Sequence, residues 1–407
     1  MSGHESKLNN ITFSNTETDE ATGWDRVGNL LLERAQFDKA EALYKILLEQ
    51  ASDEDEKQCY YHQLGYIKKN QGDYNKAVFY YKKTLEILER TLPPNHRHLA
   101  TPYNNIGSVY MNMGEYSKAL SFFEKSIDIK QKTLPPNHPD AAGSYINIGQ
   151  VYGKMGEYSK ELSFYKKSLE IYQNTLPPTD SRLAASYNGI GSAYMNMGEY
   201  SKALTSFEKS FEIEQKTLPP NHPSLAISYN NMGTLHYQTG EYWKALSFSK
   251  KALEIQQEIL PPNHPSLAAC YNNIAEMYRN MKEYSEALSY YEKALEIQQK
   301  SLPSNHPDLA TSYNNIGGVY DNIKEHLRAV LFYQKALEIR QKTLPPNHPS
   351  LAISYNNIAG VYTAMEQYPK ALSYFERALD ISQHSLPSNH PNLKVLRENI
   401  EIVKKKM

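Results

Sequence analysis

Seven histidines recur along the sequence, mostly in the motif Asn-His-Pro, and imidazoles in series are potential metal ligands. They are His96, His138, His222, His264, His306, His348 and His390. Neighbouring members are 42 residues apart, or twice that, which places them in different structural units, whereas the ligands of one ion all lie about 2 Å from it. No Cys, Asp or Glu accompanies every histidine. We therefore predict that they cap helices and bind no metal.

One unit lacks the histidine, and Thr179-Asp180-Ser181 stands in its place with other good capping side chains. Signatures of catalysis are missing from the sequence: it has no phosphate-binding loop, glycine fingerprint, nucleophile elbow or His-Glu-x-x-His motif. Its carboxylates lie mainly beside basic residues, as in Glu292-Lys293, which is typical of solvated helix faces. We predict a protein that is not an enzyme and needs no cofactor.

Net charge, cysteine content and hydropathy limit the classes of partner and the cellular location that we expect. The formal net charge is −1, which gives no electrostatic reason to expect a nucleic acid or a membrane as partner. The two cysteines, Cys59 and Cys270, make no disulfide framework, as expected in a reducing compartment. No run of 18 apolar residues occurs, and residues 1–20 are polar without a signal-peptide core. We expect a cytoplasmic monomer with a disordered polar tail at residues 1–20.

The histidines belong to a longer sequence motif, whose recurrence shows how the chain is organised. Thr-Leu-Pro-Pro-Asn-His-Pro begins at Thr133, Thr217 and Thr343. Close variants begin at Thr91, Thr175, Ile259, Ser301 and Ser385, always in steps of 42 residues. A fixed period of this length indicates a repeat protein, in which each unit buries its apolar face only against its neighbours.

One unit, 221–262, shows the elements that position these motifs. Pro223 suits the first turn of a helix, after which Leu225, Tyr229 and Met232 recur with helical spacing. Gly240 ends that helix, and a second helix follows until Pro261-Pro262 prevents its continuation. Each unit is therefore predicted to be two antiparallel helices and a short linker.

These helix pairs resemble the tetratricopeptide repeat, which carries aromatic, aliphatic, Gly, Tyr, Ala and aromatic residues at fixed spacing. Trp24, Val27 and Gly28 open the first unit, and Ala40 and Tyr44 follow on its second helix. Later units have Tyr in place of Trp, at Tyr61, Tyr103, Tyr145, Tyr187, Tyr229, Tyr271, Tyr313 and Tyr355. The resemblance implies an all-α, right-handed α–α superhelix of nine helix-turn-helix repeats plus a C-terminal capping helix.

We number the predicted repeats 1 to 9. They span 21–58, 59–95, 96–137, 138–179, 180–221, 222–263, 264–305, 306–347 and 348–388. Residues 389–407 begin like another first helix but then carry Arg397, Glu398 and Glu401, which predicts a polar capping helix on the last repeat.

The 42-residue length and the phrase His-Pro-x-Leu-Ala-x-x-Tyr-Asn-Asn-Ile resemble the repeats of kinesin light chains. This resemblance implies a protein-interaction scaffold that binds an extended peptide in a concave groove. Similar arrays are also fused to enzymes such as ADP-ribosyltransferases, so a regulatory or targeting region is one alternative. A motor cargo adaptor is another, although residues 1–20 are too short and polar for the N-terminal heptad coil of kinesin light chains.

Asparagines recur on the first helices where, in tetratricopeptide folds, side chains line the groove. We call this series the asparagine face: Asn104, Asn188, Asn230, Asn272, Asn314 and Asn356, interrupted by Ile146. Gln238 adds another amide to this surface. Four residues depart from its uncharged, amide-rich character: the charged Glu276, Arg279 and Asp321, and the apolar Met195.

A carboxamide can pair with any peptide bond, because it offers both donors and an acceptor. We hypothesise that these amides hold the backbone of an extended segment of about a dozen residues, and that the charged outliers and Met195 set its preference. Alternatively, the amides bond to adjacent helices and lock the stack. For the asparagine face both interpretations stay open, whereas for Asn231, Asn273 and Asn315 we favour the lock.

Glu161 occupies a position where other repeats have Ala, at the expected crossing of the two helices of repeat 4. An unpaired carboxylate there is costly to bury. We therefore expect local loosening of repeat 4 or an outward rotation of this side chain.

Overall fold

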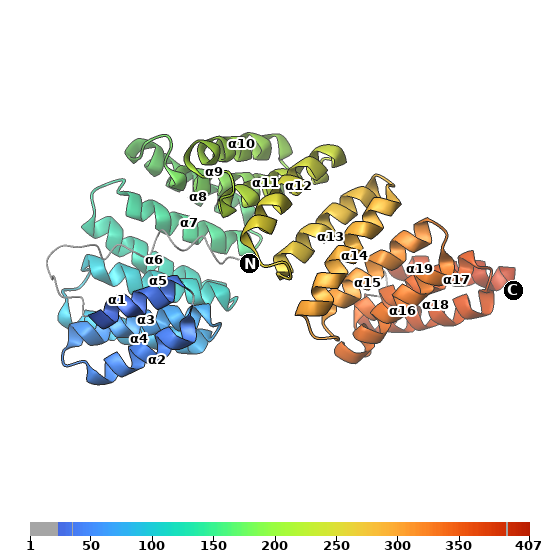
Figure 1. Cartoon of the computed structure of the whole chain (residues 1–407), viewed down its shortest axis with the longest axis horizontal. Helices are drawn as coiled ribbons and strands as arrows, with labels where there is room; N and C mark the ends of the chain where they lie inside the picture. Colours follow the sequence, from blue (N-terminus) through green and yellow to red (C-terminus); the bar gives the residue numbers. More distant parts are fainter. Residues whose placement is uncertain (1–22, 35, 388–389) are drawn as a thin grey trace. The chain divides into compact units, whose positions relative to one another are not determined.

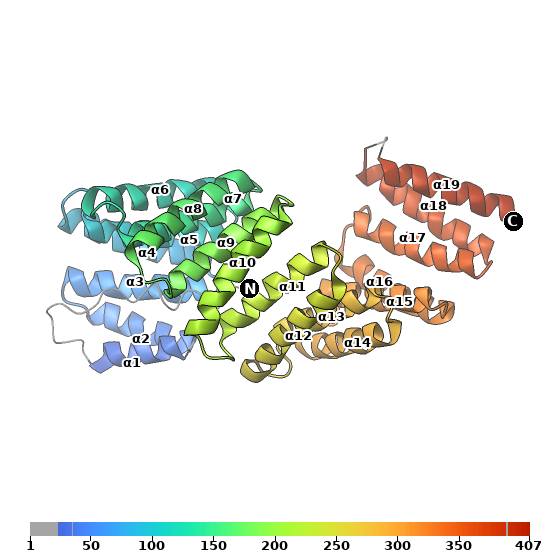
Figure 2. The ribbon, with the colours of Figure 1, turned by 90° about the horizontal axis from the view of Figure 1, so that it is seen from above.

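The structure is a computed structural model that describes residues 23–34, 36–387 and 390–407. These residues form helices joined by short turns, and no strand occurs among them. The chain divides into two compact units, unit 1 (Met1–Pro219) and unit 2 (Pro220–Met407), which we describe separately. Within each unit, successive helices lie side by side, as two perpendicular views show (Figures 1 and 2).

Unit 1 contains the first ten α-helices and one short 3-10 helix. They are α1 (Gly23–Glu33), α2 (Phe37–Gln50), α3 (Glu54–Asn70), α4 (Tyr74–Thr91), η2 (Arg97–Leu99), α5 (Ala100–Asn112), α6 (Tyr116–Thr133), α7 (Pro139–Lys154), α8 (Tyr158–Thr175), α9 (Ser181–Asn196) and α10 (Tyr200–Thr217). Unit 2 contains the other nine. They are α11 (Pro223–Gln238), α12 (Tyr242–Ile259), α13 (Pro265–Asn280), α14 (Tyr284–Ser301), α15 (Pro307–Asn322), α16 (His326–Thr343), α17 (Pro349–Ala364), α18 (Tyr368–Ser385) and α19 (Pro391–Lys406).

The described residues thus form nine helix pairs and one final helix, which confirms the predicted all-α repeat fold. One predicted repeat boundary does not coincide with a turn: α3 begins at Glu54, inside the range 21–58 assigned to repeat 1. Asp53 starts this helix, because its side chain accepts a hydrogen bond from the backbone N–H of Glu56 at 2.7 Å. The predicted tail at residues 1–20 lies outside the described residues.

The recurring histidines cap helices, as predicted. In all seven, Nδ1 accepts a hydrogen bond from the backbone N–H two residues later, at 3.2 or 3.3 Å. In repeat 5, Asp180 Oδ1 takes this role and accepts from the N–H of Arg182 at 2.9 Å. No cluster of three potential metal-ligating side chains occurs in the part of the chain that the structure describes.

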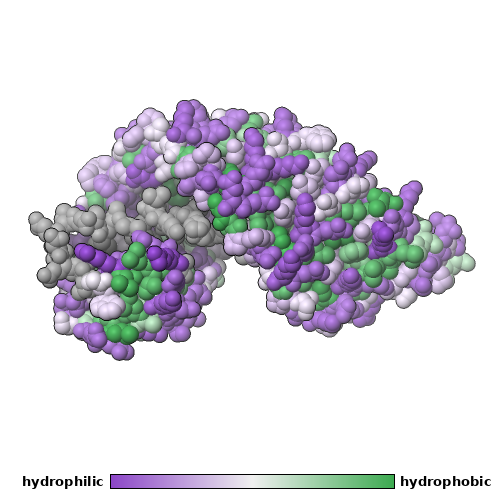
Figure 3. Space-filling model, viewed as in Figure 1, coloured by the Kyte–Doolittle hydropathy of each residue, from purple (hydrophilic) through white to green (hydrophobic). Residues whose placement is uncertain are grey.

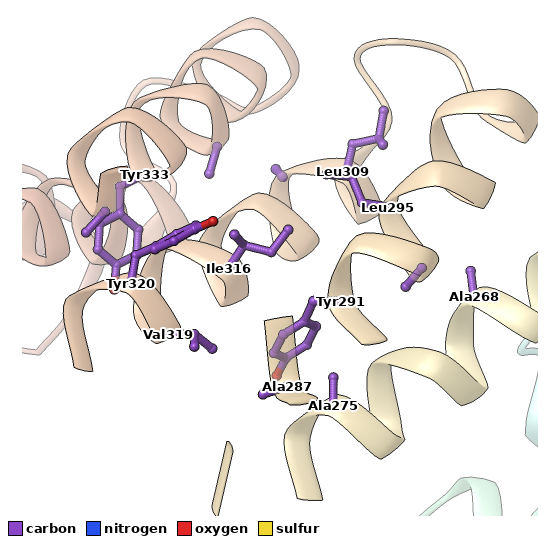
Figure 4. Packing of buried hydrophobic residues seen from close by; sticks show 14 of the residues in the cluster. Ala268, Ala275, Ala287, Tyr291, Leu295, Leu309, Ile316, Val319, Tyr320 and Tyr333 are labelled. Atoms are coloured by element: carbon purple, nitrogen blue, oxygen red, sulfur yellow. The ribbon is translucent and has the colours of Figure 1, made fainter. Parts of the chain in front are cut away.

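Small residues let the two helices of a repeat cross closely. An alanine near the start of each second helix is completely buried in eight of the nine repeats, the exception being repeat 4. A glycine of the first helix lies under an aromatic ring of the second: a Cβ atom on Gly107 would be 2.9 Å from Phe123. Figure 4 shows the equivalent place in repeat 7, where Tyr291 lies over Ala275 beside Ala287. These contacts set the distance between paired helices.

A polar contact joins successive repeats at regular intervals. A glutamine near the end of one second helix donates to the tyrosine hydroxyl of the next first helix, at 2.8–3.0 Å. The pairs are Gln131–Tyr145, Gln173–Tyr187, Gln257–Tyr271, Gln299–Tyr313 and Gln341–Tyr355. A lysine ammonium also lies 5.4–5.9 Å from the ring centre of the equivalent tyrosine in six first helices. These are Tyr103, Tyr145, Tyr187, Tyr229, Tyr271 and Tyr313. We call this set of contacts the glutamine–tyrosine ladder.

Repeat 4 corrects the expectation for Glu161. Its side chain points inward and is only 5% exposed, and α7 and α8 remain packed against each other. The predicted loosening or outward rotation was wrong because Gly153, on the facing helix, makes room for the carboxylate. A Cβ atom on Gly153 would be 2.5 Å from Oε1 of Glu161, so the carboxylate fills the space of the missing side chain.

A second adjustment accompanies the first. In repeat 5 the ring of Phe207 lies on Gly191 of its own repeat, 2.6 Å from the position of a Cβ atom. In repeat 4 the nearest ring atom of Tyr165 is 3.5 Å from the corresponding point on Gly149, and it is 2.5 Å from that on Gly189 in the next repeat. Gly189 stands where other repeats carry the second asparagine. The ring of Tyr165 has therefore moved toward α9.

The last helix covers the end of unit 2, as predicted for residues 389–407. Leu393, Leu396, Ile400 and Val403 of α19 are buried, and the last three pack with Phe375 of α18. Its outer side carries charges, including the terminal lysines. The visible surface of both units is mainly hydrophilic, with hydrophobic areas between the hydrophilic side chains (Figure 3).

Candidate functional site

The asparagine face lies along the first helices of the repeats, and each of its members is half-buried. Asn104 and Asn188 belong to unit 1, on α5 and α9. The four others belong to unit 2, on α11, α13, α15 and α17: Asn230, Asn272, Asn314 and Asn356. The structure thus places the predicted amides at equivalent positions on consecutive first helices of unit 2.

Two members of the asparagine face take part in locking the stack. Oδ1 of Asn104 accepts a hydrogen bond from Nδ2 of Asn147 on α7, at 2.8 Å. Oδ1 of Asn314 accepts from Nδ2 of Asn357 on α17, at 3.1 Å. At these two junctions the second asparagine of one repeat bonds to the first asparagine of the preceding repeat. At these positions an amide can lock the stack and still bind a peptide, because after bonding to a neighbour it keeps further donors and acceptors.

A polar cluster on α13 and α14 includes several of the predicted site residues. Glu276 forms an ion pair with Arg279, one helical turn away, and its Oε2 accepts from the hydroxyl of Tyr291 at 2.6 Å. Asn272 lies one turn before Glu276 on the same side of the helix. The structure therefore brings together three of the predicted site residues.

The charged groups of this cluster are paired with one another. Burial alone would raise the pKa of the Glu276 carboxyl, but hydrogen bonds from Arg279 and Tyr291 outweigh burial and lower it. The carboxylate is therefore charged and already paired, so Arg279 is not a free cation. Two atoms of the cluster remain buried without a hydrogen-bond partner: Oδ1 of Asn272 and Nε of Arg279.

The remaining predicted residues lie around this cluster or beyond it. Nδ2 of Asn280 donates to the hydroxyl of Tyr237 on α11 at 3.0 Å, which ties repeat 7 to repeat 6. Gln238, next to that tyrosine, is exposed. Oδ1 of Asp321 on α15 is 3.4 Å from Nδ1 of His326, an atom that is buried and makes no hydrogen bond.

Sequence reasoning missed two contacts of this site, which the hydroxyls of Tyr237 and Tyr291 make. Both tyrosines belong to the repeat pattern, and their hydroxyls reach Asn280 and Glu276 on neighbouring helices. Only the spatial pairing of helices reveals these contacts. A shallow surface pocket between α16 and α18, lined by Gln334, Tyr374 and Arg377, contains none of the predicted site residues.

Comparison with protein families identifies tetratricopeptide repeats through most of the chain. The matched segments are 60–98, 98–174, 182–258, 244–300, 266–342, 308–384 and 350–403. Comparison of the sequence with curated proteins finds no match. None of the described helices combines the length and the hydrophobicity that crossing a bilayer requires.

Several solved structures share the fold. The apo form of RapI and the apo form of the quorum sensor NprR from B. thuringiensis each have a TM-score of 0.60 and 16% identity. Each match covers 88% of this chain, together with 96% of RapI and 97% of NprR. TPR-like repeats assigned to a kinesin light chain of Podosopora anserina are 24% identical with a TM-score of 0.47, over 51% of this chain and 98% of that one.

The helix pairs, their glycine and alanine crossings and the matched segments agree with one another. The chain belongs to the tetratricopeptide repeat family.

Proposed function

We propose that this chain is a non-catalytic scaffold whose asparagine face in unit 2 binds an extended segment of another protein. The four asparagines of that unit recur at 42-residue intervals on α11, α13, α15 and α17. Helices stacked about 8–10 Å apart would present one amide to about every third residue of an extended chain. The partner is therefore a peptide segment held largely by its backbone.

One observation carries this proposal. Oδ1 of Asn272 and Nε of Arg279 are buried without hydrogen-bond partners, two turns apart on α13. Buried polar groups are nearly always bonded in folded proteins, so unsatisfied groups indicate where a ligand completes the bonding. A peptide N–H can donate to the asparagine oxygen, and a peptide C=O can accept from the guanidinium.

The charge of this cluster limits the ligand class. Glu276 and Arg279 neutralise each other through their ion pair. The face around Asn272 therefore favours an uncharged stretch of backbone over an acidic or basic motif. No feature of the described residues favours the motor-adaptor or the enzyme-linked alternative over a free-standing scaffold.

A screen of twelve-residue peptides on an array, followed by calorimetric titration of the best binder, tests the proposal. Asn272→Ala should weaken binding at least tenfold without changing the unfolding midpoint, because it removes a hydrogen-bond acceptor that the free protein does not use. Asn273→Ala is the matched control, since Asn273 is the exposed neighbour on the same helix. Unchanged binding in Asn272→Ala together with lost stability would assign this asparagine to the lock.

A further inference from the structure

Repeat 4 differs from the other repeats at several positions, and one position of repeat 5 differs with it. Glu161 replaces the buried alanine, and Gly153 replaces a larger side chain on α7. Gly189, which receives the displaced ring of Tyr165, replaces an asparagine. Ile146 replaces the asparagine of the asparagine face. In a chain of near-identical repeats, a glycine that makes room for one buried carboxylate indicates a site with its own purpose.

The carboxylate of Glu161 is buried but unpartnered. Its Oε2 makes no hydrogen bond, although the residue is only 5% exposed. Burial raises the pKa of this carboxyl to about 7, and no neighbouring cation offsets that effect. The nearby charges on α8 are already engaged: Glu157 pairs with Lys160 at 2.5 Å, and the Lys160 ammonium lies 5.0 Å from the ring centre of Tyr152. On α7, Lys154 is exposed.

The position of Gly153 shows from which side a ligand would approach. It corresponds in the repeat to Met195, Arg279 and Asp321, the residues expected to read side chains on the groove-lining face. In repeat 4 that place has no side chain, and the carboxylate of Glu161 lies directly behind it. Gly153 itself is half-buried rather than buried. The acidic group therefore lies immediately under the predicted binding face.

We propose that Glu161 is a receiving site for a single lysine or arginine side chain, which enters over Gly153. The ligand cation supplies the hydrogen bonds and the opposite charge that the free protein lacks. The natural source of that cation is a peptide bound along the first helices, and in this respect the proposal rests on the proposed function. Repeat 4 then binds a side chain of the peptide, whereas the asparagines bind the peptide backbone.

Two peptides test the site on the full-length chain. One is a twelve-residue peptide of alternating threonine and alanine with a central lysine, and the other has norleucine at that position. The lysine peptide should bind about tenfold more tightly, which is the typical gain from one charge-assisted hydrogen bond. Glu161→Gln should remove this preference while it keeps the shape of the side chain. The double variant Glu161→Ala with Gly153→Met copies repeats 3 and 5, and should fold normally and show no preference.

A small probe separates this site from the groove. The carboxyl of Glu161 is followed by ¹³C NMR in the full chain while the pH is varied, with n-butylammonium chloride or n-butanol added. Butylammonium should lower the titration midpoint by at least one pH unit, because it stabilises the charged carboxylate, and butanol should leave it unchanged.

The outcomes distinguish the two proposals. A lower midpoint with butylammonium but no binding of either peptide would support the cation site and overturn peptide binding along the groove. Equal binding of both peptides and an unchanged midpoint would overturn the cation site and leave groove binding intact. A lower midpoint together with equal binding would show that the site takes small amines but reads no peptide side chain, which overturns the assignment to a basic residue.

Discussion

Repeats 4 and 5 follow one another in unit 1 and share the same helical template, yet they fill it differently. Repeat 5 has the common solution, with Ala203 fully buried and the ring of Phe207 on Gly191. Repeat 4 places Glu161 at the crossing, opens space at Gly153 and turns Tyr165 toward Gly189. The difference teaches that, at this helix crossing, repeat 4 accommodates a carboxylate in the space left by a missing side chain on the facing helix.

Introducing the charge without the space should have the largest effect. Ala203→Glu places a carboxylate at a crossing where Met195 keeps the side chain that Gly153 lacks, and should destabilise the chain by about 3 kcal/mol or more. Guanidinium unfolding followed by circular dichroism measures the loss. Adding Met195→Gly recreates the arrangement of repeat 4 and should restore much of the stability. If the single variant unfolds like the parent, the space at Gly153 is not needed to hold a carboxylate.

The free-energy cost of burying the carboxyl of Glu161 should depend on pH. Its pKa is about 7 in the folded chain against 4.5 for a free glutamate, so the folded state holds a proton that the unfolded state releases. The contribution of Glu161 to stability is therefore most favourable below pH 4.5 and becomes less favourable as pH rises to about 7, by about 3 kcal/mol in total.

Glu161→Gln removes this dependence, so its advantage over the parent in urea unfolding should grow between pH 5 and pH 8. Glu170→Gln is the control, because Glu170 is exposed on the same helix and should show no such trend. An advantage of Glu161→Gln that stays constant with pH would contradict a buried carboxylate that takes up a proton.

Glycine substitutions sharpen the comparison at the aromatic crossing. Gly191→Ala brings a Cβ atom within 2.6 Å of Phe207 and should cost about 1–3 kcal/mol. Gly149→Ala meets nothing closer than 3.4 Å and should be neutral or stabilise by up to about 1 kcal/mol through its higher helix propensity. Thermal unfolding of both variants measures the contrast. Equal losses would show that Tyr165 still occupies its usual place.

The helix caps of the two repeats should differ least. Repeat 4 begins with His138 and repeat 5 with Asp180, and both accept the backbone N–H two residues later. Asp180→Ala should cost about 1 kcal/mol, whereas Asp180→His should retain most of that stability. Urea unfolding of the two variants checks this prediction. A similar loss in both would mean that the ion pair of Asp180 with Arg182, rather than the cap, is what matters.

The parts of the fold that the sequence predicts are local or repeated. The histidine caps depend on a bond to the residue two positions later, so the motif Asn-His-Pro contains all the information that they need. Helix bounds follow the 42-residue period for the same reason. The start of α3 at Glu54 was not predicted because the first two repeats depart from that period and Asp53 caps this helix in place of the motif Asn-His-Pro.

Contacts across helices were harder to foresee. Glu161 was judged by its own position, whereas its accommodation depends on Gly153 of another helix, and the shift of Tyr165 depends on Gly189 of another repeat. The pairing of Glu276 with Arg279 could have been predicted from their spacing of three residues. The bond from Tyr291 to Glu276 could not, because it depends on how α14 is rotated against α13.

The glutamine–tyrosine ladder has a consequence for the history of such a chain. Because Gln257, Gln299 and Gln341 reach Tyr271, Tyr313 and Tyr355 through the same geometry, the end of any one of these repeats is chemically matched to the start of any other. Unequal recombination between their coding segments would add or remove whole modules without creating a mismatched junction. Array length could thus change by whole repeats, whereas repeat 4 is matched through Tyr165 to the glycine at position 189 of its successor.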